Sequence, residues 1–312
     1  MQRFLVFLGL AVVALVVLAG SWQALRPAEG EWAAVDVGRV TPAQAPRTVD
    51  PARPHLRVAV GAMVSPRDTY EIYSRLLAHI GSLAGADIEF VQRKTYAEVN
   101  EMLHRGELDL AFVCSGPYAL GRDTYGFDLL ASPEVQGSSQ YRSYLITRNT
   151  SELHTLQDLR GRTFAFTDPD SNTGYLVPRY WLALLGETPE SFFSRTIFTY
   201  SHDNSIMAVA KGLVDAAAVD SLIWEHFAKR QPELTLQTRI IQRSEPHAIP
   251  PVVASRQLSG ALRNRLRDIL LGMHKDGEGK AILSELMIDR FVQPDDAWYE
   301  SIRTMREVVE RQ

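Results

Sequence analysis

The sequence predicts an α/β fold built as two lobes with largely parallel sheets. From His55 onward, strand-like and helix-like segments alternate, which is the pattern of α/β proteins. Two segments, Arg142–Thr147 and Ser244–Val252, are placed to carry the chain out of a first lobe and back into it. We therefore expect residues 55–143 and 250–312 to form the first lobe and residues 144–249 the second, with a ligand cleft between the lobes.

Composition excludes several classes of protein. The 312 residues carry a formal net charge of -4, with acidic and basic side chains mixed along the chain, so no basic tract for nucleic acid is present. The single cysteine excludes an intramolecular disulfide and a multi-cysteine zinc site. We expect no metal and no cofactor.

The N-terminus predicts export. Arg3 precedes an apolar run of 17 residues (positions 4 to 20), long for a signal peptide and just long enough for a spanning helix. Residues 1–22 are therefore either a cleaved signal peptide or an N-terminal apolar helix that anchors the protein in the membrane, and residues 23–54 form an Ala/Pro-rich linker. Ser21 stands where a bacterial lipoprotein would have its lipidated cysteine, which excludes that modification.

The first lobe begins with a strand at Leu56–Met63 and a helix from Ser65-Pro66 through Leu83, with proline at its first position. Ile88–Val91 is the next strand, and Thr95 with Glu98 forms a capping box for a helix that ends near Gly106. The apolar strand Leu108–Val113 runs straight into Cys114-Ser115-Gly116-Pro117-Tyr118. We expect that segment to be a polar loop at the carboxyl end of a strand, where open α/β sheets bind ligands.

The second lobe holds the most informative stretch. A strand at Thr163–Phe166 leads through Asp168 into Ser171-Asn172-Thr173-Gly174 and then into a helix that settles around Pro178. Free backbone amides and the positive end of a helix dipole make this a site for an anion. For an isolated cluster of this kind, an ordinary helix cap would be the better explanation.

The remaining elements continue the alternation. They are a short helix around Leu156–Leu159, a strand at Thr196–Tyr200, a helix at about Asp203–Leu213, a strand at Ala216–Val219, a helix at about Leu222–Lys229, a strand at Val252–Ala254 and helices to the C-terminus.

Three motifs in order resemble one family. FTDPDSNTGYLVP resembles the DPxSxSGxxxP-type loop of the phosphate, phosphite and phosphonate solute-binding proteins of ABC transporters, and LDLAFVCSGPY and SHDNSIMAVAKGLVDAAAVDS resemble two further segments of that family. The resemblance covers the chain from about His55 to its end. It implies a two-lobed type II periplasmic-binding-protein fold that closes on a small phosphorus oxyanion and delivers it to an ABC permease from the periplasm. We expect a monomer that is not an enzyme. Asn172 departs from the hydroxyl residue common in the family.

The resemblance also implies the ligand-binding residues. Ser171, Asn172 and Thr173 would donate to the anion from the second lobe, and His202, at the start of the next helix, would add a donor. His202 is equally explained as a surface residue near a helix cap. From the first lobe, Ser115 and Tyr118 in the expected loop, and Tyr70 early in the first helix, would close the pocket; either tyrosine is also explained as a packing residue.

Asp220 follows the strand Ala216–Val219 and would place a carboxylate beside the anion. Hydrogen phosphate and many phosphonates carry a P–OH group near neutral pH, whereas sulfate does not. A carboxylate acceptor would therefore accept the former and repel the latter. Asp220 is also placed to cap the helix that begins near Leu222, and both roles are compatible.

Cys114 can be interpreted in three ways: as a packing residue, as a ligand in a sensor, or as part of a catalytic site. A small buried thiol at the end of a strand needs no function. As a soft ligand in the cleft, it would instead suit a periplasmic sensor that binds an oxyanion such as arsenite and signals to a membrane histidine kinase. Cys114, His202 and Asp220 also contain the residue types of a catalytic triad, but no nucleophile elbow or cysteine-protease signature accompanies them.

Overall fold

The structure, a computed structural model, describes residues 53–312. The predicted signal peptide or anchor at 1–22, and all but the last two residues of the predicted linker at 23–54, lie outside the described residues. None of the helices found between residues 53 and 312 is long and apolar enough to cross a membrane.

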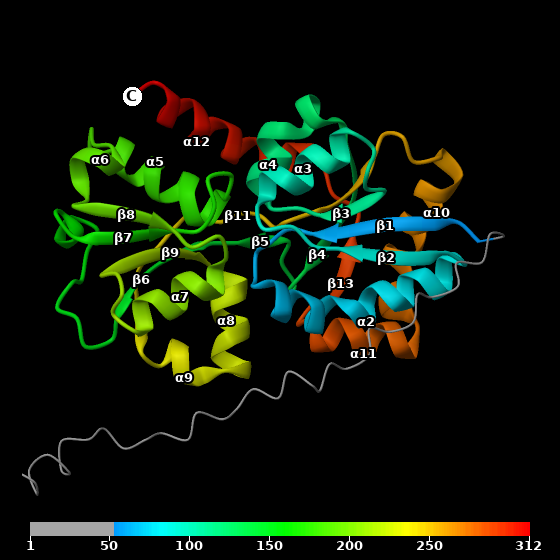
Figure 1. The fold of residues 1–312 in the computed structure, drawn as a ribbon, viewed down its shortest axis with the longest axis horizontal. Helices are drawn as coiled ribbons and strands as arrows, with labels where there is room; N and C mark the ends of the chain where they lie inside the picture. The colour runs from blue at the N-terminus through cyan, green and yellow to red at the C-terminus, as the bar shows by residue number, and fades with distance from the viewer. Residues whose placement is uncertain (1–52) are drawn as a thin grey trace, which may run out of the picture. The chain divides into compact units, whose positions relative to one another are not determined.

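Two separate sheets, seen side by side in Figure 1, confirm the α/β two-lobed fold. We call the part built on the six-stranded sheet the first lobe and the part built on the five-stranded sheet the second lobe. The first sheet has the order β13 (Arg290–Val292), β4 (Phe127–Glu134), β12 (Val252–Ser255), β3 (Leu110–Phe112), β1 (His55–Val60), β2 (Asp87–Val91). The second has the order β10 (Thr238–Arg243), β6 (Ser143–Arg148), β9 (Ala216–Asp220), β7 (Thr163–Phe166), β8 (Arg195–Phe198).

Both sheets are mixed, so the expectation of largely parallel sheets is wrong. β1 pairs in parallel with β2 and β3, and β7 pairs in parallel with β8 and β9. The strands that enter after the chain has changed lobes, β6 and β12, run antiparallel to their neighbours. A helical crossover within one sheet produces parallel neighbours, and no such crossover leads into these two strands.

Helices cover both faces of each sheet. Around the first sheet they are α2 (Pro66–Ala84), α3 (Tyr96–His104), α4 (Ser115–Gly121), α10 (Gly260–Gly272) and α11 (Gly277–Glu285). Around the second they are α5 (Val177–Ala183), α6 (Pro189–Phe192), α7 (His202–Ala210), α8 (Ser221–Arg230) and α9 (Pro232–Thr235). The C-terminal helix α12 (Glu300–Glu310) packs against both α4 and α5, and Figure 1 shows it running between them.

Alternation of side chains along the central strands gives each lobe two cores. In β1, Val58 packs into one buried cluster and Ala59 into the cluster on the opposite face. In β9, Ala216 and Ala218 face one cluster while Ala217 and Val219 face the other. Side chains of a strand point alternately to the two faces of its sheet, so strands covered on both faces are apolar throughout.

A two-stranded ribbon lies between the sheets. It pairs β5 (Gln140–Tyr141) with β11 (His247–Ala248), one strand from each passage of the chain between the lobes. The carboxyl ends of β2, β3, β7, β8 and β9 each lead into a helix or helical turn, and these starts supply most residues of the candidate site.

One predicted loop is a helix. Cys114-Ser115-Gly116-Pro117-Tyr118 was expected to be irregular, but Ser115 begins α4 and Cys114 occupies the preceding cap position. Pro117 is compatible with this because the amides of the first turn have no partner within the helix.

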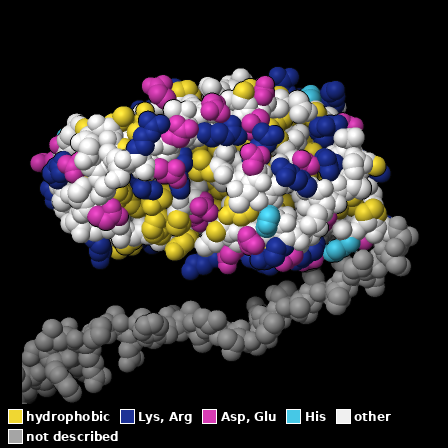
Figure 2. All heavy atoms as spheres, turned by 90° about the horizontal axis from the view of Figure 1, so that it is seen from above, with side chains coloured by type: hydrophobic (Ala, Val, Ile, Leu, Met, Phe, Trp, Pro, Cys, Tyr) yellow, Lys and Arg dark blue, Asp and Glu magenta, His cyan; other side chains and the backbone are white. Residues whose placement is uncertain are grey.

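Charged side chains are dispersed over the visible surface. Figure 2 shows acidic and basic groups intermixed on the face seen from above, with no continuous patch of one sign there. This distribution agrees with the mixed charge of the sequence.

Candidate functional site

The loop after β7 leads into a helix as predicted, but two backbone amides that were expected to be free are paired: that of Gly174 with the Ser171 Oγ and that of Asn172 with the Cys114 sulfur. The Ser171 Oγ accepts a hydrogen bond from the Gly174 amide (3.0 Å), as an ordinary cap does. A π-helical turn, Asn172–Leu176, continues directly into α5, in which Pro178 lies in the first turn. The helical segment therefore begins at Asn172, and its start lies within the protein rather than at the surface.

Two glycines allow the polypeptide to pack closely here. A β-carbon at Gly174 would lie 2.3 Å from the Thr167 Oγ1, and one at Gly116 would lie 2.5 Å from the Asp170 carbonyl oxygen. Both distances are far below a van der Waals contact, so a larger residue would force the backbone apart. Gly116 thus lets the start of α4, in the first lobe, pack directly against the loop of the second lobe.

Asn172 lies in a chain of hydrogen bonds that links the lobes. Its Nδ2 donates to the Tyr141 hydroxyl (3.2 Å), which in turn pairs with the Ser115 Oγ (2.5 Å). Its Oδ1 is buried and has no partner in the described structure. A rotation of the amide by 180° would let Oδ1 accept from Tyr141 and would turn the NH₂ group towards the unfilled position.

Five buried polar atoms at neighbouring helix starts have no hydrogen-bond partner. Among residues 53–312, ten buried side-chain atoms lack one, and half of them belong to this region. We call these five atoms the polar cluster; they are Tyr96 Oη, Asn172 Oδ1, Thr173 Oγ1, Ser201 Oγ and His202 Nε2. Buried polar groups are normally paired, so a concentration of unpaired ones marks a place for a partner that the chain itself does not supply.

His202 is held as a neutral donor. Its Nδ1 accepts from the backbone amide of Asp220 (3.1 Å) and lies 3.2 Å from the Thr167 Oγ1. A ring nitrogen that accepts an amide hydrogen carries no proton, so the proton of the neutral ring is on Nε2. Burial lowers the pKa of His202 to about 3, which keeps the ring uncharged at neutral pH. The unpartnered Nε2 is therefore an N–H donor.

Asp220 both caps a helix and adds a carboxylate to this region. Its Oδ1 accepts from the Leu222 amide (2.7 Å) and the Ile223 amide (3.4 Å) at the start of α8, which confirms the predicted cap. Burial raises the pKa of the Asp220 carboxyl to about 7, against the lowering effect of these two amides. The group therefore exchanges a proton close to physiological pH.

Two tyrosines near Asp220 were not predicted. Tyr96, the first residue of α3, and Tyr141, in β5, are fully buried, and burial is the main cause that raises the pKa of each hydroxyl. Charge on Asp220 and on Cys114 raises both values further, which places all four groups near one another. Tyr96 follows a capping threonine and Tyr141 lies in a strand of two residues. Neither position indicates a binding site from the sequence alone.

Two predicted residues lie elsewhere. Tyr70 is 53% exposed and stacks on Phe90 (5.8 Å between ring centroids), outside the polar cluster. The Tyr118 hydroxyl donates to Asp296 (2.8 Å) and its ring packs against Tyr299, because residues 115–121 form a helix that directs this side chain towards α12. Tyr73, almost one helical turn after Tyr70, instead lies near Asp220, and burial and that carboxylate raise its pKa to about 12.

Cys114 is a buried thiol. Its sulfur accepts hydrogen bonds from the backbone amides of Asn172 and Gly116, yet burial is the stronger effect and raises the pKa to about 11. The group is therefore a neutral thiol at physiological pH, which is a poorer soft ligand than a thiolate. Its contact with the Asn172 amide joins the start of α4 to the loop of the second lobe.

The lobes are in contact around this region. The His202 amide donates to the Met63 carbonyl (3.0 Å), the Ser65 amide to the Asp203 Oδ1 (3.0 Å), and the Tyr96 amide to the Asp168 Oδ2 (3.2 Å). Each of these bonds joins the first lobe to the second. The structure is therefore a closed form, in which the polar cluster is sealed from solvent.

Cys114, His202 and Asp220 do not have the geometry of a catalytic triad. The Nδ1 of His202 accepts from the amide of Asp220 and so cannot donate to its carboxylate, and no hydrogen bond joins Cys114 to His202 in the described residues. A base oriented by a carboxylate is the essential feature of such a triad.

Known proteins similar to this chain share its architecture. The family model described as "ABC transporter, phosphonate, periplasmic substrate-binding protein" matches residues 58–299. The phosphonates-binding periplasmic protein of Escherichia coli is 30% identical over 156 residues, covering 49% of this chain and 46% of that protein. The phosphate-import protein PhnD of Mycolicibacterium smegmatis is 32% identical over 165 residues, covering 48% and 50%. The chain thus spans about half the length of these relatives.

Solved structures are also similar to this chain. A binding protein component of an ABC phosphonate transporter from Pseudomonas aeruginosa has a TM-score of 0.79 at 26% identity, over 83% of this chain and 87% of that chain. PhnD1 from Prochlorococcus marinus, solved in complex with methylphosphonate, has a TM-score of 0.75 at 18% identity, over 83% and 99%, and shows the shared fold. With a family match over residues 58–299, this chain belongs to the periplasmic substrate-binding proteins of phosphonate ABC transporters.

Proposed function

We propose that this protein binds a small phosphorus oxyanion outside the cytoplasmic membrane and delivers it to an ABC permease. One observation carries the proposal: the polar cluster, closed between two lobes and left without partners by the chain itself. Membership of a family of transport binding proteins supports it.

The chemistry of the cluster suits such an anion. Tyr96, Thr173 and Ser201 offer hydroxyl groups and His202 offers an N–H, so the anion would be held by neutral donors. The helix starts at Asn172 and His202 add the positive ends of two helix dipoles. Ser171, Ser115 and Tyr141 hold these donors in position through the bonds described above.

Asp220 would select for a proton on the ligand. While Oδ1 caps α8, the other carboxylate oxygen has no hydrogen-bond partner among the described residues. That oxygen would accept from the P–OH group of hydrogen phosphate or of a phosphonate, whereas sulfate would place an unpaired negative charge against it. The ligand is thus phosphate, phosphite or a phosphonate rather than sulfate.

We further propose that the protein is a monomer that binds its ligand without catalysis. Its first lobe would consist of residues 55–143 and 250–312 and its second lobe of residues 144–249. Support for this division comes from β6, which begins at Ser143, and β12, which begins at Val252. The protein would be exported to the periplasm, with residues 1–22 either removed or kept as an anchor. Arsenite sensing is not favoured, because Cys114 is a neutral thiol.

Titration calorimetry of residues 53–312 with phosphate, phosphite, methylphosphonate, sulfate and arsenite tests the proposal. We expect at least one phosphorus oxyanion to bind and sulfate to bind far more weakly. Binding of arsenite alone, lost in Cys114→Ala, would replace transport by sensing, and binding of none of the five would remove the proposal.

A further inference from the structure

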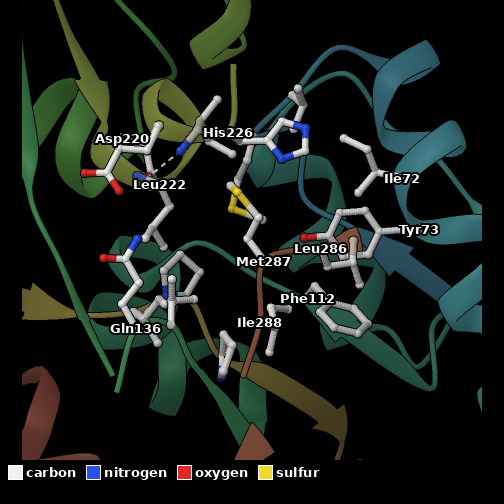
Figure 3. A pocket seen from close by; sticks show the side chains of 18 of the residues that line it. Ile72, Tyr73, Phe112, Gln136, Asp220, Leu222, His226, Leu286, Met287 and Ile288 are labelled. Carbon is white, nitrogen blue, oxygen red and sulfur yellow. Dashed lines mark hydrogen bonds between the residues drawn. The ribbon is translucent and has the colours of Figure 1, made fainter. Parts of the chain in front are cut away.

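A cavity of about 110 Å³ lies beside Asp220 and is lined mainly by apolar side chains. Figure 3 shows Asp220 at one side and Ile72 and Tyr73 at the other, with Met287 between them and Ile288 below. We call this cavity the side chamber. Its walls come from both lobes, since Leu222 belongs to α8 and Ile72 to α2.

Two lining residues of the side chamber, Asp220 and Met63, also contact His202 of the polar cluster. Asp220 lines the chamber through its side chain and donates through its amide to the ring of His202. Met63 also lines the chamber, and its carbonyl accepts from the amide of His202 (3.0 Å). A ligand that meets the free carboxylate oxygen of Asp220 would therefore border the side chamber at this residue.

We propose that the side chamber holds an uncharged apolar substituent, so that the preferred ligand is an alkylphosphonate larger than methylphosphonate. This inference rests on the proposed function, because it extends the ligand from the site of the oxyanion. A cavity of about 150 Å³ lined by Leu, Ile and Phe holds benzene. The side chamber is smaller and suits a chain of roughly four carbons by the same measure.

The charged groups around the chamber do not favour an ammonium group. The Asp220 Oδ1 is occupied by the start of α8. Glu225 also lines the chamber, but it accepts a hydrogen bond from the Tyr144 hydroxyl (2.7 Å). His226 and Gln136 add neutral polar groups, since burial is the main cause that lowers the pKa of His226. An ammonium group would lose its hydration against Met63, Ile72 and Met287, while the free oxygen of Asp220 would already be engaged by the P–OH group of the ligand.

A series of ligands tests the inference on the unmodified protein. Dissociation constants are measured by calorimetry for phosphate, methylphosphonate, n-butylphosphonate and 2-aminoethylphosphonate. Each buried methylene strengthens binding roughly fourfold, so butylphosphonate should bind at least about tenfold more tightly than methylphosphonate. The aminoethyl compound should bind more weakly than the butyl compound.

Two variants test whether the gain in affinity for the butyl compound arises in the side chamber. Ile72→Trp fills the chamber and should bring the ratio of methyl to butyl dissociation constants close to one. Leu83→Trp, on the same helix but 41% exposed and outside the chamber, is the matched control and should keep the ratio of the unmodified protein.

The outcomes separate the two proposals. If phosphate and methylphosphonate bind but the butyl compound binds no more tightly, the side chamber does not hold an alkyl group and only the oxyanion site stands. Tightest binding of the aminoethyl compound, or an unchanged ratio in Ile72→Trp, likewise overturns the inference. If no compound binds, the proposed function itself fails.

Discussion

Thr173 and Thr188 both stand at the start of a helical segment in the second lobe, yet their hydroxyls have opposite surroundings. Thr188 is exposed and completes a capping box: its Oγ1 accepts from the Ser191 amide (3.3 Å), and the Ser191 Oγ accepts from the Thr188 amide (2.9 Å). Thr173 is fully buried and its Oγ1 has no partner in the described structure.

The difference separates a residue that stabilises the fold from one that we propose to bind a ligand. A satisfied cap lowers the free energy of the folded state by about 1 kcal/mol. A buried unpaired hydroxyl costs about 1–3 kcal/mol, which the fold tolerates only if something else requires the group. The same contrast distinguishes Thr95, whose capping box is complete, from Ser201, whose side chain is left unpaired.

Asp220 caps a helix through one carboxylate oxygen and leaves the other without a hydrogen-bond partner among the described residues. Asp220→Asn should therefore have the largest effect on the free energy of unfolding. The folded-state pKa of about 7 lies above the usual value of 3.8. Such a carboxyl favours folding only while protonated: its contribution is complete below about pH 4, is lost as the pH rises through 7, and then stays constant. Asparagine keeps the cap but never ionises.

The variant should therefore exceed the unmodified protein in stability by up to about 4 kcal/mol at pH 8, and by much less at pH 4. Urea unfolding of the ligand-free protein at the two pH values measures this difference. The variant should also lose discrimination against sulfate, because an amide can donate to it. A stability difference independent of pH, together with unchanged selectivity, would contradict both roles of Asp220.

Thr173→Val tests the unpaired hydroxyl directly. It removes Oγ1 while preserving shape, so the affinity for the phosphorus oxyanion should fall by roughly 10–150-fold, the range for a hydrogen bond to a charged group. The stability of the ligand-free protein should stay the same or rise, because a buried unpaired group is removed. Calorimetry and urea unfolding give the two values.

Thr188→Val is the matched control, with the same substitution in the same lobe. It should lower the free energy of unfolding by about 1 kcal/mol and leave the affinity unchanged. If both valine variants lowered stability alike and neither changed the affinity, the contrast between the two threonines would have no functional meaning.

Asp203→Ala should have a smaller effect, through closure of the lobes. The bond from the Ser65 amide to Asp203 joins the lobes, and its loss disfavours the closed form by about 1 kcal/mol, or roughly fivefold in apparent affinity. Small-angle scattering should show the protein contracting on ligand, with the variant needing more ligand.

The control for closure is Asp215→Ala. Asp215 accepts from the Thr163 amide (2.8 Å) within the second lobe, so this variant should lose stability while its affinity stays the same. Identical scattering curves with and without saturating ligand, in the unmodified protein, would show that closure is not coupled to binding.

Local patterns predicted much of this molecule. The proline start of α2, the capping box at Thr95, the loop at Ser171 and the position of His202 each depend on a few neighbouring residues, and the structure agrees with them. Asp220 was placed correctly because an apolar strand followed by an acid and a helix determines which end of the sheet it occupies.

The rest depends on contacts that a sequence pattern does not contain. Tyr141 lies in a strand of two residues, and Tyr96 belongs to the first lobe but contacts the second through Asp168. Tyr73 rather than Tyr70 approaches Asp220 because of the rotation of α2. β4 was missed because its strand contains Ser132 and Pro133 and lacks clear alternation.

A crystal structure of residues 53–312 with methylphosphonate tests the central claim most directly, because it locates the ligand oxygens. The account predicts phosphonate oxygens within about 3 Å of the Thr173 Oγ1 and the His202 Nε2, and one against the free oxygen of Asp220. The polar cluster would then have its missing partners. A ligand bound elsewhere, with these atoms still unpaired, would contradict the account.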